Sequence, residues 1–504
     1  MVNSSRESKT VSTAIVALGR SSTVVLTLVL AASLSRTLEQ AAYGTFQQII
    51  YIYTMMAVVL QLGAPQTTAY LLPKLSRTQG KSLLQRILFF LLANGIVFSC
   101  LLYFGADTAG SLLKNPMLPP LLRTYAPIPM LILPTLALPG VCLAYGRPGM
   151  SASFQIISKL ITLIAVSVPI LLGYSVRTAI MVWVLASFAT LLLGIGVMYL
   201  PYRGCTAVAG PYGLLHVLRF GLPVAAAGVA GVLLAGADRF VVSRLFGAEV
   251  FAQYVNGAVQ LPFLQILTGS LAAVLLPVFS RLADSEQGRV EAKDIWSRVI
   301  RKNAAFLYPC ACFAFFFADD IMRLVYSERY VVSAPFFRIY LMAIFVRVVP
   351  YLPLMLGLGA VWSYLVGATL ACLIAWSGAF VLCTHFGNPA LAAVSYVCAV
   401  YVMSLFLISV ISRRLNVRIM ALLPLREVSG YLAASIVTAL VSFLVARQVL
   451  GNSFPSTLLR LILGIGVFSI LYAIVTKSLG LETIGVLKPV LQRFSSVRLR
   501  LLRL

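Results

Sequence analysis

The chain has 504 residues, of which 60% are hydrophobic and 11% charged, and its mean hydropathy is +0.97. A soluble domain of this length needs a polar surface that the composition does not supply, so the sequence excludes a soluble protein. The formal net charge of +25 would suit nucleic acid in a soluble protein, but here the placement of the basic residues decides their role.

Apolar segments long enough to cross a bilayer recur from near residue 13 to near residue 476. A helix needs roughly 20 residues to cross a hydrocarbon core of about 30 Å. The first segment runs from about Val11 to Leu34, which is longer than the apolar part of a cleavable signal, and another follows at once. We predict an all-α, multi-pass membrane protein with about 14 transmembrane helices, centred near residues 24, 57, 95, 132, 161, 189, 228, 264, 309, 345, 371, 400, 438 and 466.

The fourth of these spans contains Pro127, Pro129, Pro134 and Pro139. Prolines free backbone groups that hydrocarbon cannot satisfy, so such a span is expected to face a protein partner or a cavity rather than lipid.

Basic residues gather in alternate loops, together with Arg6 and Lys9 near the N-terminus. The basic segments on that side are 72–86, 281–302, 412–427 and 477–504. Cytoplasmic loops of membrane proteins carry such an excess of Lys and Arg. Both termini are therefore predicted to be cytoplasmic, and no nucleic-acid partner is expected.

Short strings recur in the same order in the two halves of the chain. The pairs are Ser35-Arg36 and Ser243-Arg244, Leu71–Arg77 (LLPKLSR) and Leu275–Arg281 (LLPVFSR), Asp107 and Asp319, and Leu122–Tyr125 (LRTY) and Phe337–Tyr340 (FRIY). The copies lie six spans apart, an even number, so they share one orientation and form a parallel repeat.

The repeat predicts two pseudo-symmetric six-helix lobes, 1–205 and 210–415. Two additional transmembrane helices follow over 428–476, and 477–504 form a basic cytoplasmic tail. In transporters built from repeats, the substrate site lies near the midplane between them.

No catalytic constellation is evident. Neither His216 nor His385 has a nucleophile and an acid arranged around it, and the eight cysteines show no CxxC spacing. Asp319-Asp320 would suit a metal-dependent glycosyltransferase, but the pair ends an apolar helix, and we favour a charged stop at the membrane surface. We expect neither an enzyme nor a bound metal or cofactor.

Charges inside the predicted spans are more informative, because each costs about 2.5–3.5 kcal/mol at the bilayer centre. Arg20, Lys159 and Arg347 lie within spans one, five and ten, and for them we favour a water-filled cavity. Arg36 and Arg239 lie near the outer ends of spans one and seven, where extension of the side chain to the headgroups is an equal alternative.

These deep charges are nearly all cationic, which suits an anionic substrate. Arg binds phosphate through two parallel hydrogen bonds, and Lys acts as a point charge. An exporter of organic cations would instead need buried carboxylates, whereas Glu39, Asp107 and Asp238 all lie near span ends. The pattern therefore favours a phosphate or pyrophosphate group as part of the substrate.

Three stretches resemble oligosaccharide flippases of the polysaccharide-transport group. Leu30–Ile49 is similar to the first hairpin of that family, in which a small-residue helix ends in Arg-x-Leu and is followed by Tyr-Gly and an aromatic residue. Gly236–Pro262 looks like the same element opening the second lobe, and Phe315–Ile344 is similar to the passage between helices nine and ten.

The resemblance implies the fold of the multidrug/oligosaccharidyl-lipid/polysaccharide exporter superfamily, whose members work by alternating access. It implies a polyprenyl-(pyro)phosphate-linked oligosaccharide as substrate, moved from the cytoplasmic to the outer leaflet of the cell inner (plasma) membrane. Family cavities hold the phosphate with basic residues of the first helix and the second lobe, which points here to Arg20 and Arg239.

Two other branches of the superfamily stay as alternatives. Lipid II flippases commonly carry Arg-Asp on the first helix, but here Gly19-Arg20 is followed by Ser21-Ser22. Drug and cation antiporters commonly carry an acid within the first helix, and this helix has none.

Release of the substrate requires the basic residues to bind its phosphate less tightly. We assign this change to protonation or ion binding at Asp238 or Glu39. We expect a monomer that contacts membrane lipids and works beside a polysaccharide polymerase or other assembly enzymes.

Overall fold

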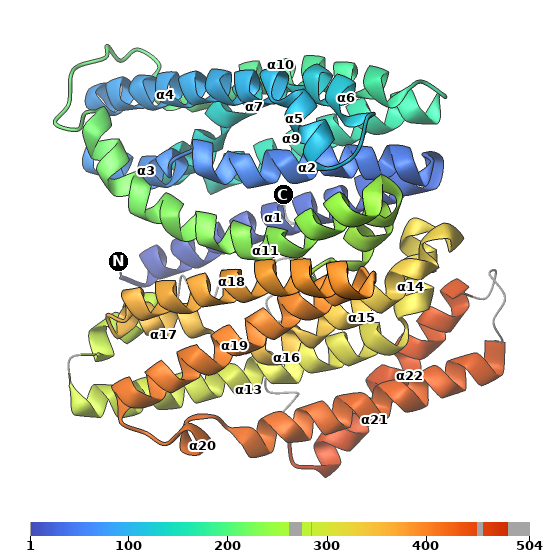
Figure 1. The fold of residues 1–504 in the computed structure, drawn as a ribbon. Coiled ribbons are helices and arrows are strands. Elements are labelled where there is room, and N and C mark those ends of the chain that lie inside the picture. The colour runs from blue at the N-terminus through green and yellow to red at the C-terminus, as the bar shows by residue number, and fades with distance from the viewer. Residues whose placement is uncertain (1, 262–274, 284, 451–456, 482–504) are drawn as a thin grey trace, which may run out of the picture. The chain divides into compact units, whose positions relative to one another are not determined.

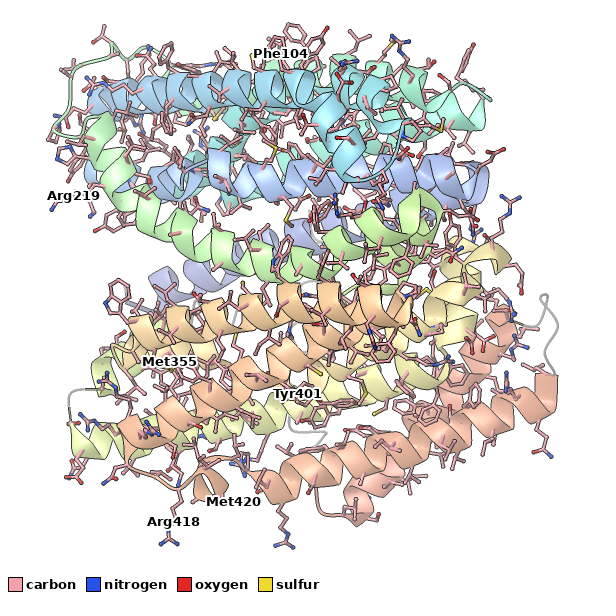
Figure 2. The ribbon with its side chains drawn as sticks, in the orientation of Figure 1. Phe104, Arg219, Met355, Tyr401, Arg418 and Met420 are labelled. Carbon is pink, nitrogen blue, oxygen red and sulfur yellow. The ribbon has the colours of Figure 1, made fainter. Side chains whose placement is uncertain are left out.

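The computed structural model describes the backbone of residues 2–261, 275–283, 285–450 and 457–481. Within these ranges every regular element is a helix (Figure 1). Large apolar side chains lie exposed on the outside of the bundle, such as Phe104 and Met420, each 78% exposed (Figure 2). Such an apolar exterior requires lipid rather than water around it, and the chain is a multi-pass helical membrane protein.

The chain divides by its contacts into two compact units. The first contains Met1–Val255 and Cys372–Tyr396, and the second contains Asn256–Ala371 and Val397–Leu504. The predicted lobes follow the sequence repeat instead, and their boundaries stay a prediction.

The elements that precede the middle of the chain are α1 (Val2–Thr37), α2 (Gln40–Leu60), α3 (Ala64–Leu71), η1 (Leu72–Lys74), α4 (Arg77–Phe104), α5 (Ala106–Leu112), α6 (Leu118–Tyr125), α7 (Ile128–Ile132), η2 (Leu133–Ala137), α8 (Leu138–Ala144), α9 (Pro148–Leu171), α10 (Val176–Tyr199), η3 (Leu200–Tyr202) and α11 (Leu214–Gly257). Gly247 interrupts α11 with a positive φ of 79°, which glycine adopts without steric cost. This residue therefore marks a kink between two helical segments of α11.

The later elements are α13 (Glu286–Phe316), α14 (Ala318–Tyr326), η4 (Glu328–Ser333), α15 (Ala334–Met342), α16 (Ile344–Arg347), α17 (Tyr351–Gly357), α18 (Val361–Phe386), α19 (Ala390–Leu415), α20 (Ile419–Leu422), α21 (Leu425–Leu450) and α22 (Thr457–Ser478). The two last long helices, α21 and α22, pack on each other, and α21 also packs along α13. These are the two helices that the sequence adds after its repeat.

Among the described residues, nine helices are long and apolar enough to cross a membrane, and eleven if two bent pairs each count as one span. The other three predicted spans, centred near residues 24, 228 and 264, fall on α1, on α11 and on residues 262–274, the last of which lie outside the described residues. The total of 14 stays a prediction.

The proline-rich fourth span is broken into α6, α7, η2 and α8, and 67% of its apolar window is buried inside the protein. For the neighbouring α4 the buried share is only 28%. The expectation that this span faces protein rather than lipid is confirmed. Its counterpart in the second half, Glu328–Gly357, is broken in the same manner and is 56% buried.

Close helix packing depends on glycines at particular points. A Cβ atom added to Gly95 of α4 would lie 2.6 Å from the Cα atom of Met130, which belongs to the backbone of α7. A Cβ atom added to Gly196 of α10 would meet nothing within 4 Å.

We therefore expect Gly95→Ala to lower the free energy of unfolding by about 1–3 kcal/mol, because the two backbones must move apart. Gly196→Ala is the matched control and should be neutral or stabilising by up to about 1 kcal/mol, since alanine restricts the unfolded helix segment. Thermal unfolding of the purified protein in detergent measures both. Equal midpoints for the two variants would contradict the close approach of α4 and α7.

Candidate functional site

Asp238 of α11 is a fully buried carboxyl group in the first unit, with a relative exposure of 0%. The Tyr254 hydroxyl donates a hydrogen bond to its Oδ2 atom over 2.6 Å. Tyr51 of α2 lies beside it: its hydroxyl donates to the Gly236 carbonyl over 3.1 Å and interacts electrostatically with both Asp238 and Arg239. Two tyrosines from different helices thus surround an acid and its neighbouring arginine.

Glu39, the other predicted coupling acid, has a different environment. It is exposed at the N-cap position of α2, where its side chain makes no capping hydrogen bond. Of these two acids, Asp238 is buried and accepts a hydrogen bond, whereas Glu39 is exposed.

Lys159 lies near the middle of α9 and is half-buried. A Cβ atom on Gly19 of α1 would lie 2.8 Å from the Cβ atom of Ala152, so α1 and α9 pack closely. Lys159 follows Ala152 by two helical turns and therefore lies on the same face of α9. Within the described residues its ammonium group has neither an ion-pair partner nor a hydrogen-bond acceptor.

The remaining predicted cations lie on other elements. Arg36 is exposed in the last turn of α1, and Arg347 is half-buried at the end of α16, where its charge acts on the Tyr364 hydroxyl of α18. Arg20 lies on α1, but its side chain is outside the described residues. Asp238 and Arg239, both predicted site residues, share Tyr51 as a neighbour.

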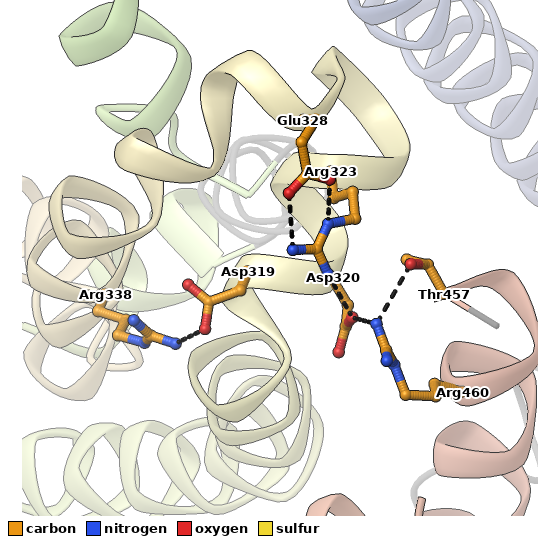
Figure 3. Close-up of polar contacts among 7 residues, drawn as sticks. All are labelled: Asp319, Asp320, Arg323, Glu328, Arg338, Thr457 and Arg460. Carbon is orange, nitrogen blue, oxygen red and sulfur yellow. Dashed lines mark hydrogen bonds and ion pairs between the residues drawn. The ribbon is translucent and has the colours of Figure 1, made fainter. Parts of the chain in front are cut away.

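Asp319 and Asp320 each have an arginine partner (Figure 3). Arg338 Nη2 lies 2.6 Å from Asp319 Oδ2, and Arg460 Nη2 lies 2.6 Å from Asp320 Oδ1. Arg323 approaches Asp320 at 3.8 Å. The pair is therefore more than the charged stop that the sequence suggested, because Asp320 fastens α14 to α22.

Two further groups extend these contacts. Arg323 makes two further bonds to Glu328, at 2.5 and 2.9 Å, and Arg460 Nη2 donates to Thr457 Oγ1 over 3.2 Å. Three arginines thus face three carboxylates, which leaves no excess charge for an anion. Among the described residues no group of His, Cys, Asp or Glu could hold a metal ion.

The first half contains the counterpart of one of these ion pairs. Arg123 of α6 pairs with Asp107 of α5, as Arg338 of α15 pairs with Asp319 of α14. Both carboxylates occupy the second position of the short helix that follows a long one. The two ion pairs give the sequence repeat a physical meaning.

Sequence reasoning missed Arg460, whose side chain is only 2% exposed within the apolar helix α22. The signal was a lone arginine in an otherwise apolar segment, and the sequence had assigned Asp320 only to the charged end of a helix. Tyr51 and Tyr254 were missed as well, because tyrosines in apolar helices carry no such mark.

The fold is similar to that of known membrane transporters. The lipid II flippase MurJ, in an inward closed conformation, superposes with a TM-score of 0.71 at 14% identity, over 93% of this chain and 99% of that one. An inward-facing multidrug resistance MATE family transporter of the MOP superfamily gives 0.59 at 16% identity, over 79% of this chain and 98% of that one. A variant of the MATE transporter VcmN of Vibrio cholerae gives 0.56 at 15% identity, over 82% and 98%.

The family follows from the sequence itself. Residues 33–335 match the family model described as polysaccharide biosynthesis protein. The matched residues make up more than half of the chain. The chain belongs to this family, and its fold is that of the MOP superfamily. A search of curated protein sequences finds no match.

The Asp320–Arg460 ion pair should contribute strongly to the attachment of α22 to α14. Removing one partner of a buried pair leaves an uncompensated charge and costs about 3–5 kcal/mol. We therefore expect Arg460→Met to lower the unfolding midpoint strongly in detergent, whereas the double variant Asp320→Leu/Arg460→Met should recover most of the loss.

The exposed pair of the first half is the control. Arg123→Met breaks an ion pair whose side chains are 40% and 70% exposed, and such pairs contribute about 0–1 kcal/mol. Midpoints lowered equally by Arg123→Met and Arg460→Met would contradict the account.

Proposed function

We propose that the chain flips a polyprenyl-(pyro)phosphate-linked oligosaccharide from the cytoplasmic to the outer leaflet by alternating access. Membership of the polysaccharide biosynthesis family and a fold shared with a lipid II flippase support a substrate of this class. The site of action is the cell inner membrane, with both termini in the cytoplasm, as the basic loops predict.

Lys159 carries the proposal. A lysine at the centre of a membrane-spanning helix is costly, and within the described residues no carboxylate neutralises it. A cation kept in this state suits an anion that arrives and leaves, which is the behaviour of a substrate phosphate. The Asp320–Arg460 pair shows the opposite solution, in which a permanent counter-ion serves structure.

A sugar head group cannot cross hydrocarbon unaided, because its hydroxyls would lose their hydrogen bonds to water. In the proposed cycle a polar cavity encloses the head group while the polyprenyl chain stays in lipid. Lys159 binds the phosphate, and rocking of the repeats then exposes it on the other side. The other predicted cations, Arg20, Arg36, Arg239 and Arg347, remain candidates for further contacts with the phosphate.

The coupling step belongs to Asp238 rather than to Glu39. A buried acid changes its interactions strongly when it gains a proton or a cation, whereas an exposed acid remains solvated in both states. Asp238 lies beside Arg239, so neutralising the carboxylate would release the arginine toward an anionic substrate and ionising it would draw the arginine back.

The proposal predicts that cells lacking this protein accumulate lipid-linked sugar intermediates on the inner leaflet. Wild type should clear them, whereas Lys159→Gln and the double variant Arg20→Ala/Arg347→Ala should not, because the phosphate loses its cations. Lys477→Gln is the control, since Lys477 is exposed at the end of α22. If nothing accumulates and sensitivity to cationic drugs rises instead, the protein is a drug antiporter.

A second prediction concerns coupling. In vesicles with an imposed proton or cation gradient, Asp238→Asn should make flipping insensitive to the gradient, while its amide oxygen still accepts the Tyr254 hydrogen bond. Glu39→Gln should retain the wild-type response. Gradient-independent flipping by the wild-type protein would refute the coupling role of Asp238.

A further inference from the structure

The tenth predicted span, Glu328–Gly357, is broken at Pro350, which has a non-helical ψ of 78°. Side chains of neighbouring helices donate hydrogen bonds to main-chain carbonyls around this break. The bonds run from the Tyr401 hydroxyl to Met342 over 3.0 Å, from the Tyr308 hydroxyl to Phe345 over 3.0 Å, from Asn303 Nδ2 to Val348 over 2.7 Å and from Trp296 Nε1 to Pro350 over 3.2 Å. We call Trp296, Asn303, Tyr308 and Tyr401 the span-ten donors.

Three of the span-ten donors belong to one helix, α13, and are buried. Trp296 is 0% exposed, Asn303 4% and Tyr308 3%. Trp296 and Asn303 are two helical turns apart and therefore lie on the same face of α13. A carbonyl that a broken helix frees inside a membrane needs a donor from elsewhere in the protein. α13 supplies three such donors and thereby holds the main chain at the break.

Arg347 lies inside the stretch that these donors hold. The two carbonyls nearest to it that accept such bonds are those of Phe345 and Val348, one on each side. The Arg347 side chain is half-buried, and its charge acts on the Tyr364 hydroxyl of α18. The position of a binding side chain depends on the hydrogen bonds that fix its surroundings. The donors therefore set the place from which the guanidinium group extends.

The first half of the chain offers an internal comparison, because its fourth span is broken in the same manner. At the offset that relates Asp107 to Asp319, the residues of α4 equivalent to the three donors of α13 are Leu84, Leu91 and Ile96. These side chains have no hydrogen-bond donor. The broken stretch of that half, residues 128–144, contains no charged residue. The polar donors and the arginine thus occur together in the second half, and both are absent from the equivalent positions of the first.

This comparison bears on the role of Arg347. The first half forms the same kind of break without a charge, so the break itself does not require an arginine. A charge within a membrane-spanning segment is costly and commonly marks a functional site. A guanidinium group binds phosphate oxygens through two parallel hydrogen bonds, which demand a fixed orientation.

We propose that Asn303 and Tyr308, assisted by Trp296 and Tyr401, are positioning residues that hold Arg347 where it binds the phosphate of the substrate. The inference rests on the proposed function, because it assigns Arg347 to the same phosphate as Lys159. The span-ten donors contact the main chain around Arg347 and act on the substrate only through it.

Substitutions at the two donors nearest to Arg347 test this role. Tyr308→Phe removes the hydroxyl group, and Asn303→Leu removes the amide at similar volume. The matched control is Tyr472→Phe, because the Tyr472 hydroxyl also donates to a main-chain carbonyl over 3.0 Å, that of Ala305 in the unbroken part of α13. Each protein is reconstituted into vesicles, and flipping of a fluorescent polyprenyl-pyrophosphoryl sugar is measured over a range of substrate mole fractions.

We expect each donor substitution to raise the half-saturating mole fraction roughly two- to tenfold, the range that corresponds to the loss of one hydrogen bond, with a smaller change in the maximal rate. Tyr472→Phe should leave both quantities unchanged. Arg347→Gln should raise the half-saturating mole fraction further, and adding Asn303→Leu to it should change nothing more, because the donor acts through the arginine.

An equal loss from Tyr472→Phe, or a further several-fold loss when Asn303→Leu is added to Arg347→Gln, would overturn the positioning role. Unchanged half-saturation in Arg347→Gln would overturn it as well. If Asn303→Leu does not fold, Tyr308→Phe carries the test, since it removes a single oxygen atom. Absence of flipping by the wild-type protein would instead refute the proposed function, so the two failures are distinguishable.

Discussion

Buried charges are costly unless they are neutralised or solvated, and the described part of this chain shows three different settings for them. Arg460 and Asp320 neutralise each other permanently and attach the last helix to α14. Asp238 is held by a tyrosine hydroxyl and lies beside an arginine. Lys159 has no counter-ion among the described residues, and we propose that its charge binds the substrate phosphate transiently. The distinction between permanent and transient partners separates the scaffold of the protein from its proposed substrate site.

The internal repeat connects these features. The Asp107–Arg123 and Asp319–Arg338 pairs occupy equivalent places, and the proline-broken spans beside them are both largely buried. At these pairs the second half differs by one residue of consequence: Asp320 follows Asp319, whereas Thr108 follows Asp107. That additional acid is the one that Arg460 binds. The extra carboxylate is thus bound by a residue of the extra helix pair.

The sequence predicted the helical membrane fold, the repeat and the family, because span length, hydropathy and motif order depend on local composition. It also predicted that the fourth span faces protein, since its prolines demand this. It could not pair Arg460 with Asp320 or Asn303 with Val348, because these contacts join residues 140 and 45 positions apart in the chain. Helical periodicity assigns a face to each residue but not the neighbour of that face. For the same reason the sequence weighed Asp238 and Glu39 equally, although only Asp238 is buried.

The most direct test of the central claim is transport by the purified protein in proteoliposomes. A polyprenyl-pyrophosphoryl oligosaccharide with a fluorescent sugar is placed in both leaflets, and a membrane-impermeant quencher reports the fraction that reaches the outside. The account predicts protein-dependent flipping that requires the phosphate-linked sugar and is not inhibited by cationic drugs. Export of a cationic drug by the same vesicles, with no movement of the lipid-linked sugar, would contradict it.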